Sequence, residues 1–378
     1  MSETISFFCR PGRSRTGTAK GALLMGLSLT ACLATPLMAQ SQLPARTAAI
    51  LQDGLIVTAD AFILPSYERW AEATDGLALS LERYCEGNDG IGAAETAFRE
   101  SFLAWQQASL IQTGPAMDLE APLRVQLWPD AKGFSRRAVR AALASEDPAL
   151  LTTAGLDAQS IALPNLTALE VLIFDDLAPG SFACDLATSI GRYQSGLAGS
   201  IAADWAEGSA FRAEFDTAMT GNTRYRAVDD LARELLSGMV VHTDRLQRFK
   251  IRRGLGAEPG DARSERTEAM RSGLGLASIE AGFRALAAIY EVPCGFFDVT
   301  PEIGGPVDYR VLARTADNVA NSISAETSSL TEIAQEDGAA AVELRGYGDL
   351  ISYQQDYLKI GLPQSIGFTS GFTSADGD

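Results

Sequence analysis

Histidine is almost absent from this sequence of 378 residues, which contains only His242. A peptidase site of the His-x-x-Glu type with a further histidine ligand therefore cannot be assembled from this chain. His242 itself falls in an apolar stripe at helical spacing. We predict that it is a buried core histidine rather than a metal ligand or a catalytic base.

Other catalytic signatures are missing as well. The sequence has no Gly-x-Ser-x-Gly motif, which gives no support to a serine hydrolase of the α/β type. Gly273-Leu274-Gly275 lies inside a helical pattern with no strand before it, so it does not indicate dinucleotide binding. No Cys-x-x-Cys spacing occurs, and zinc or thiol-redox chemistry has little support.

Positive charge is scarce. Lys and Arg number 31 against 48 Asp and Glu, for a net charge of −17. Such a balance repels nucleic acid and anionic membrane surfaces and predicts no nucleic-acid partner. The basic run Arg245, Arg248, Lys250, Arg252 and Arg253 lies at a predicted helix end, where it complements the helix dipole and needs no ligand.

Long apolar runs are confined to the N-terminus. A basic start precedes the apolar run 21–31, which is too short to span a membrane, so we interpret residues 1–39 as a signal peptide. Two endings compete, a lipobox before Cys32 and a signal-peptidase site at Ala39. Both predict export to the periplasm. Membrane attachment is expected only through a lipid on Cys32.

Strand-like alternation is absent too, and apolar residues recur every three or four positions. One stripe contains Leu186, Ile190, Tyr193, Leu197, Ile201 and Trp205, and a second contains Leu276, Ile279, Phe283, Leu286 and Tyr290. The fold class is therefore predicted to be all-α. Residues 365–378 repeat Gly-Phe-Thr-Ser, end in acid, and are predicted to be disordered.

Two segments carry a family resemblance. Residues 163–176 read LPNLTALEVLIFDD, and residues 127–137 read LWPDAKGFSRR. Together they resemble the imelysin-like family, named for an insulin-cleaving membrane protease with a Gly-x-His-x-x-Glu motif. The resemblance implies two packed helical bundles related by duplication. We place them at 40–180 and 181–364, with a boundary near residues 178–184.

The motif positions of that family fall on Asn165, Thr167 and Glu170. Asn165 follows a proline and is predicted to cap a helix. Thr167 and Glu170 are three residues apart and share a helical face. Threonine in place of the motif histidine offers a poor transition-metal ligand. The hydroxyl of Thr167 can still help Glu170 to bind a hard cation or a polar ligand. Alternatively, Glu170 only pairs with a nearby arginine.

The resemblance places further residues near the motif glutamate. Trp128 and the arginines 136 and 137 belong to the upstream segment, and we hypothesise that Arg136 or Arg137 neutralises Glu170 or receives an anionic group. The later segment 262–276 resembles an Arg/Ser-rich helix entry of related proteins. There Arg266, Arg271 or Ser272 is expected to face Glu170 from the other half.

Three cysteines follow the predicted signal peptide, at positions 85, 184 and 294. Pairing is expected in an oxidising compartment. We hypothesise a Cys85–Cys184 disulfide, because both lie at predicted helix edges in the part that resembles the family. A Cys184–Cys294 bond is the alternative.

Relatives in this family are linked to iron uptake in the bacterial envelope. The leading hypothesis is thus an exported, non-proteolytic protein that binds a ligand or cation in a polar cleft, with a possible metal ion as cofactor. Envelope iron-uptake or peroxidase proteins are the expected partners. The alternatives are a metallopeptidase with oxygen ligands alone and a structural envelope protein without a small ligand.

Overall fold

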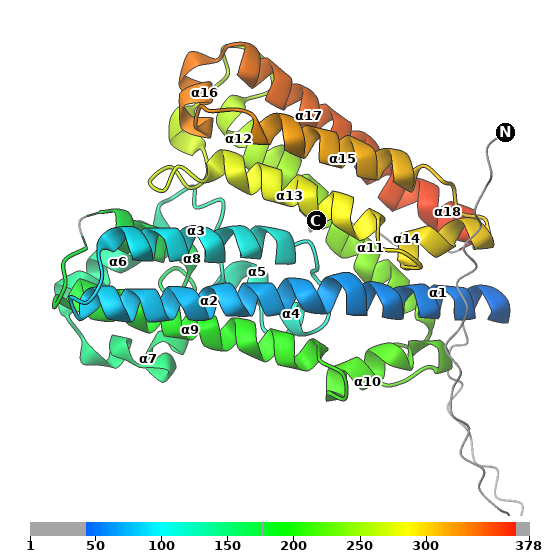
Figure 1. Ribbon diagram of the computed structural model, residues 1–378, viewed down its shortest axis with the longest axis horizontal. Coiled ribbons are helices and arrows are strands. Elements are labelled where there is room, and N and C mark those ends of the chain that lie inside the picture. The colour runs from blue at the N-terminus through cyan, green and yellow to red at the C-terminus, as the bar shows by residue number, and fades with distance from the viewer. Residues whose placement is uncertain (1–42, 176, 368–378) are drawn as a thin grey trace, which may run out of the picture.

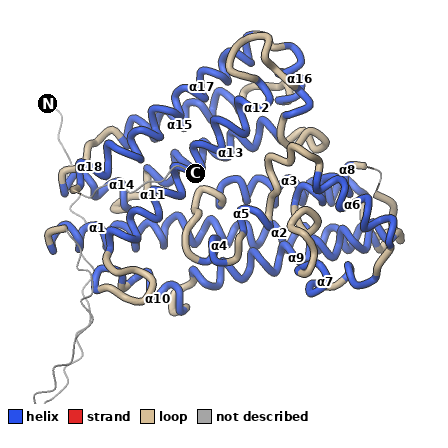
Figure 2. The backbone as a smooth tube through the Cα atoms, turned by 180° about the vertical axis from the view of Figure 1, so that it is seen from behind, coloured by secondary structure: helices blue, strands red, loops and turns tan. Residues whose placement is uncertain are grey.

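The computed structural model describes residues 43–175 and 177–367, and within them the chain is helical with no strand (Figure 2). The all-α prediction is therefore confirmed. The predicted signal peptide at 1–39, with Cys32, lies outside the described residues. So does most of the predicted tail. Ser365 and Ile366, its first two residues, are an exception: they belong to a helix because Ile366 packs into the core.

Four helices form the first bundle: α2 (Leu64–Cys85), α3 (Ile91–Ala108), α8 (Leu166–Phe174) and α9 (Phe182–Trp205). The apolar stripe predicted from Leu186 to Trp205 lies on α9, where all of its members except Leu197 are buried. Trp70, Trp105 and Trp205 are among the bundle's fully buried side chains. Since each large aromatic ring removes much apolar surface from water, these residues dominate the packing energy of this bundle.

The second bundle consists of α11 (Val228–Asp244), α13 (Gly275–Tyr290), α15 (Tyr309–Ser324) and α17 (Ala339–Asp356). Two of these helices continue through π-helical turns, α11 into Arg245–Ile251 (η4) and α12 (Arg252–Leu255), and α17 into Tyr357–Gly361 (η7) and α18 (Leu362–Ile366). Helix α13 packs against α3, so the two bundles share one continuous core (Figure 1).

Short helices connect the long ones. Those of α type are α4 (Pro115–Asp118), α5 (Ala121–Arg124), α6 (Phe134–Ser145), α7 (Thr153–Asp157), α10 (Ala210–Asp216), α14 (Phe296–Val299) and α16 (Leu330–Glu336). Those of 3₁₀ type are η2 (Pro148–Leu151), η3 (Ala218–Thr220), η5 (Ser264–Arg266) and η6 (Thr300–Ile303). Several of the α-type connections lie on the face of the first bundle that is seen from behind (Figure 2).

One long helix runs through both bundles. Helix α1 (Ala45–Thr58) continues through the π-helical turn Ala59–Ile63 (η1) into α2. Helix α1 contacts α11 and α14 of the second half, whereas α2 contacts α3 and α9 of the first. By length and composition this helix is apolar enough to cross a membrane, but half of its most apolar window is buried. It is a core helix by its contacts.

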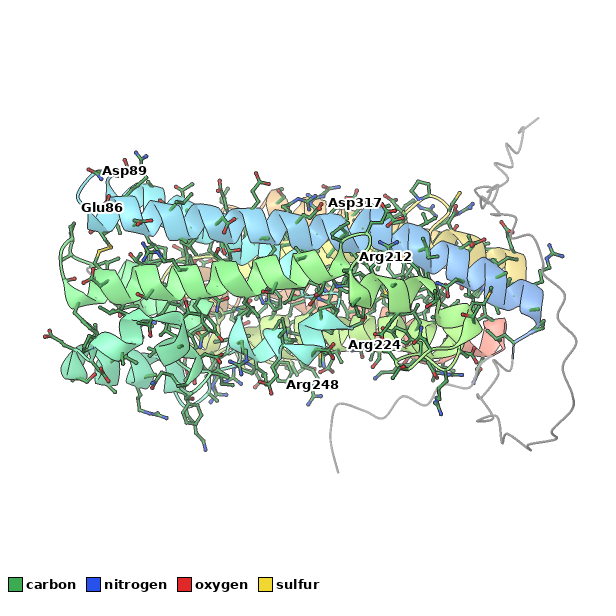
Figure 3. All side chains as sticks on the ribbon, turned by 90° about the horizontal axis from the view of Figure 1, so that it is seen from below. Glu86, Asp89, Arg212, Arg224, Arg248 and Asp317 are labelled. Carbon is green, nitrogen blue, oxygen red and sulfur yellow. A yellow bond between two sulfur atoms is a disulfide. The ribbon has the colours of Figure 1, made fainter. Side chains whose placement is uncertain are left out.

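The predicted boundary at residues 178–184 does not separate the bundles. Helix α9 begins within it, at Phe182, and packs along α2, so that the two helices lie side by side (Figure 3). A disulfide joins Cys85 to Cys184 with 5.5 Å between the Cα atoms, as predicted. The resemblance gave the number of bundles, but the helix partners depend on long-range packing that local composition does not encode.

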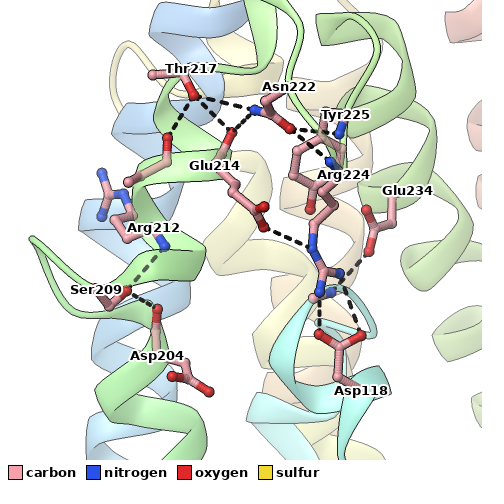
Figure 4. Close-up of polar contacts among 12 residues, drawn as sticks. Asp118, Asp204, Ser209, Arg212, Glu214, Thr217, Asn222, Arg224, Tyr225 and Glu234 are labelled. Carbon is pink, nitrogen blue, oxygen red and sulfur yellow. Dashed lines mark hydrogen bonds and ion pairs between the residues drawn. The ribbon is translucent and has the colours of Figure 1, made fainter.

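The chain passes to the second bundle between α10 and α11, where polar side chains fix the crossing (Figure 4). Arg224 binds Asp118 of α4 and, at 3.3 Å, Glu214 of α10. The Asn222 side chain closes the turn by accepting from the backbone N–H groups of Arg224 and Tyr225 at 3.0 and 2.8 Å.

Candidate functional site

The motif segment folds into α8, and Asn165 begins it as predicted. The Oδ1 atom of Asn165 accepts a hydrogen bond from the Ala168 N–H at 2.9 Å, which satisfies one of the free donors of the first turn. The Nδ2 group donates to the Ile161 carbonyl at 2.5 Å. Asn165 is fully buried. Its polar atoms thus serve the helix cap, and its expected role as a ligand contact is not supported by this geometry.

Glu170 lies one turn further along α8, and its partner comes from the other half of the chain. Oε1 of Glu170 accepts hydrogen bonds from the backbone N–H of Ser272 at 2.9 Å and from the Ser272 hydroxyl at 2.8 Å. Of the three residues expected to face Glu170 across the bundles, Ser272 is the one that binds it. Oε2 accepts no hydrogen bond from the described part of the chain.

Burial raises the pKa of Glu170 above its ordinary value, while the two bonds from Ser272 and the charge of Arg271 act in the opposite direction. The side chain is 8% exposed, so desolvation of the carboxylate has the larger effect. Glu268, a nearby acid, raises this pKa further. The site therefore favours a protonated Glu170 more than water would.

This environment gives a testable pH dependence. Because the folded-state pKa of Glu170 is raised, its contribution to stability is present below the ordinary value of 4.5 and is lost as the pH rises through the folded-state pKa. Glu170→Gln keeps an acceptor for Ser272 without the charge. We expect its stability relative to the natural protein to increase from about pH 4 to about pH 8, as the carboxylate of the natural protein becomes charged, and urea unfolding measures this change. A difference that is constant with pH would contradict this.

Thr167, Arg271 and Trp128, which were also predicted to belong to the site, bind partners other than Glu170. Thr167 donates a long hydrogen bond to the Leu127 carbonyl at 3.4 Å. Arg271 pairs with Asp175 through Nε at 2.9 Å and not with Glu170, although its charge still lowers the pKa of Glu170. Thr167 belongs to the first turn of α8, and the Arg271–Asp175 pair lies at its C-terminal end. Trp128 lies in the connection between α5 and α6. The guanidinium carbon of Arg253 lies over its ring, 5.7 Å from the ring centroid.

Neutralisation of Glu170 by an arginine of the upstream segment is not found, whereas the alternative, that Arg136 or Arg137 receives an anionic group, stays a prediction. Neither Arg136 nor Arg137 forms an ion pair with Glu170. Arg137 is exposed, lies 4.7 Å from the Phe134 ring centroid and donates to the Lys132 carbonyl. Arg266 is exposed on η5 and makes no hydrogen bond to Glu170. Buried Glu170 is satisfied by Ser272 instead, since a hydroxyl and a backbone N–H carry a smaller desolvation cost than a guanidinium.

A buried polar network, which no sequence pattern predicted, lies between the bundles. Lys250 Nζ donates to Glu268 Oε2 at 2.5 Å, to Gln106 Oε1 at 2.8 Å and to Ser278 Oγ at 3.2 Å. Gln126 Nε2 donates to the other Glu268 oxygen at 2.7 Å. Gln106 and Gln126 belong to the first half of the chain. The network therefore links both bundles beside Glu170.

Lys250 was assigned to a basic run that complements a helix dipole, but its side chain is only 2% exposed and belongs to this buried network. Burial lowers the pKa of its ammonium, and the charge of Glu268 opposes that effect. Two signals were visible in the sequence. Lys250 follows directly on an apolar stripe, and Glu268 precedes an apolar helix. Neither signal says that the two residues meet.

His242 is a core residue, as predicted. It is 1% exposed, and its Nε2 lies 3.2 Å from the Gly282 carbonyl oxygen. Burial lowers the pKa of His242 to about 3, so the ring is neutral at pH 7. Within residues 43–175 and 177–367, His, Cys, Asp and Glu side chains nowhere gather in a group of three that could hold a metal ion.

A family profile described as Imelysin matches residues 63–350. No curated protein sequence matches this one significantly. The structure is similar to the crystal structure of an imelysin-like protein from Psychrobacter arcticus 273-4, with a TM-score of 0.68 and 17% sequence identity. The similarity covers 88% of this chain and 99% of that one, and at this identity it shows the fold.

Proposed function

The chain belongs to the imelysin family, and from this premise we propose that it is an exported binding protein that acts without hydrolysis, at a polar site beside Glu170. The proposal is supported chiefly by the contacts of Glu170. One of its oxygens is bound by Ser272 of the other half, and the position two residues after Asn165 holds threonine. The usual pairing of a metal-binding imidazole with this carboxylate is therefore not present.

Oε2 of Glu170 supports a binding role. This oxygen has no hydrogen-bond partner among the described residues, and a raised pKa favours its protonated form. A protonated carboxyl can donate to a neutral or anionic ligand, and an ionised one can accept from a donor or contact a hard cation. By the resemblance to envelope proteins of this family, we assign the role to iron or metal uptake in the periplasm.

Purified protein tests the proposal against a metallopeptidase. We expect metal well below one ion per chain when the protein is purified without chelator, and no cleavage of insulin or casein. Elemental analysis and gel-based digestion measure the two properties. Near-stoichiometric metal that is lost in Glu170→Gln, together with cleavage that stops on chelation, would refute a non-hydrolytic function.

Export is tested separately with Cys32→Ser. If Cys32 is lipidated, this variant moves from the membrane fraction to the periplasm on fractionation. If the signal is instead cleaved near Ala39, both proteins are found in the periplasm. Retention in the cytoplasm would contradict export.

A further inference from the structure

A pocket of about 210 Å³ is lined by residues of α6, α8 and the first turn of α9. Its floor is apolar and contains Val139 of α6 and Val171, Leu172 and Leu177 from α8 and the turn after it, all of them buried. The pocket is therefore suited to a small molecule with an apolar body.

The rim of this pocket is positively charged. Arg136 and Arg140 lie one helical turn apart on α6, and Arg271 reaches it from the second half of the chain. Asp175 is the acid among the lining residues that the structure describes. Three guanidinium groups against one carboxylate give a local excess of positive charge, in a chain whose net charge is −17.

The three arginines differ in how far they are already bound. Arg271 donates to Asp175 through Nε at 2.9 Å. Arg136 and Arg140 are exposed and form no hydrogen bond or ion pair within the described part of the chain. Their guanidinium forks thus remain free to bind an anion in two-pronged fashion.

The position of α6 is well defined, which matters for this pair. Both oxygens of the Asp130 carboxylate cap the helix, accepting from the N–H groups of Phe134 at 2.7 Å and Ser135 at 2.8 Å. Gly133, just before the helix, adopts a φ of 63°, a conformation that suits glycine. Arg136 therefore lies in a well-capped first turn of α6, and Arg140 lies one turn further along the same helix.

We propose that this pocket binds a small amphiphilic carboxylate, with the carboxylate on Arg136 and Arg140 and the apolar body on the floor of Val139, Val171 and Leu172. The inference rests on the proposed binding function and adds the chemical class of the ligand. A carboxylate fits better than inorganic phosphate, because phosphate has no apolar part to cover the floor. Val171 follows Glu170 and Arg271 precedes Ser272, so an occupant also touches the residues next to the Glu170–Ser272 contact.

Titration calorimetry with sodium hexanoate and sodium benzoate tests this, with inorganic phosphate and hexanol as comparison probes. We expect hexanoate or benzoate to bind, and phosphate and hexanol to bind at least about tenfold more weakly. Arg136→Ala and Arg140→Ala should each weaken carboxylate binding about tenfold or more, as expected for a lost charge-assisted hydrogen bond. Arg137→Ala is the matched control and should change affinity less than about twofold.

Each other outcome overturns the assignment. Equal binding of phosphate would point to a general anion site, and an equal effect of Arg137→Ala would point to non-specific attraction. Absence of carboxylate binding would remove the ligand class, even when the protein carries no metal and cleaves no peptide, so that the proposed function stands. Metal-dependent cleavage would instead refute the proposed function, whatever the pocket binds.

Discussion

Lys250→Met is expected to destabilise the protein by about 3–5 kcal/mol, the usual cost of removing one partner of a buried ion pair. The Lys250 ammonium and the Glu268 carboxylate are about 2% exposed each. Without Lys250, Glu268 keeps its negative charge in a site that has little water. Gln106 and Ser278 would also lose the ammonium donor. The free energy of unfolding in urea measures the effect.

Two comparisons make this result specific. Arg252→Met, two residues further along, removes an ion pair with Asp349 in which the side chains are 38% and 69% exposed, and should cost less than about 1 kcal/mol. The double variant Lys250→Met with Glu268→Gln should be more stable than the sum of the single effects predicts, since the uncompensated charge is gone. A loss below about 1 kcal/mol for Lys250→Met would show that this network does not stabilise the bundles.

Removal of the disulfide is expected to have an effect of similar size. The Cys85–Cys184 bond links residues 99 apart in the sequence, for which the chain-entropy account gives a loss of about 4.7 kcal/mol on removal. The double variant Cys85→Ala with Cys184→Ala avoids leaving a thiol in the core. Thermal and urea unfolding without reductant measure the change against the natural protein.

The single variants provide the control for the disulfide. Each of them breaks the same bond, so both should be about as unstable as the double variant. Helices α2 and α9 should stay packed through their other contacts. We therefore expect circular dichroism at about 25 °C to show a helix content close to that of the natural protein. Full stability in the double variant would mean that the bond adds nothing beyond the packing of α2 on α9.

Local features of the sequence predicted local structure well. Asn165 after a proline predicted the start of α8, and the stripe around Trp205 predicted the buried side of α9. His242 was predicted to be buried because its apolar neighbours recur at helical spacing. In each case the relevant contacts lie within a few turns of the residue, so that the pattern alone is informative.

The site depended on contacts that no local pattern contains. Ser272 and Glu170 are 102 residues apart in the sequence. Ser272 binds Glu170 partly through its backbone N–H, a contact that residue type alone does not predict. Lys250 lies in the π-helix η4, where the wider turns shift the phase of the helix. A periodicity of 3.6 residues therefore gives the wrong face for the residues that follow.

The helix from Ala45 to Cys85 has a consequence for how the halves of this protein can move. It is continuous, and it donates apolar side chains to both cores. A hinge motion that moved the two bundles apart would have to bend or break this helix. We therefore expect the bundles to move relative to each other by twisting about this helix. The π-helical turn at Ala59–Ile63 is the part of the helix that should deform most easily. A fragment of the chain that ends between the bundles would therefore lack part of the apolar partners of this helix.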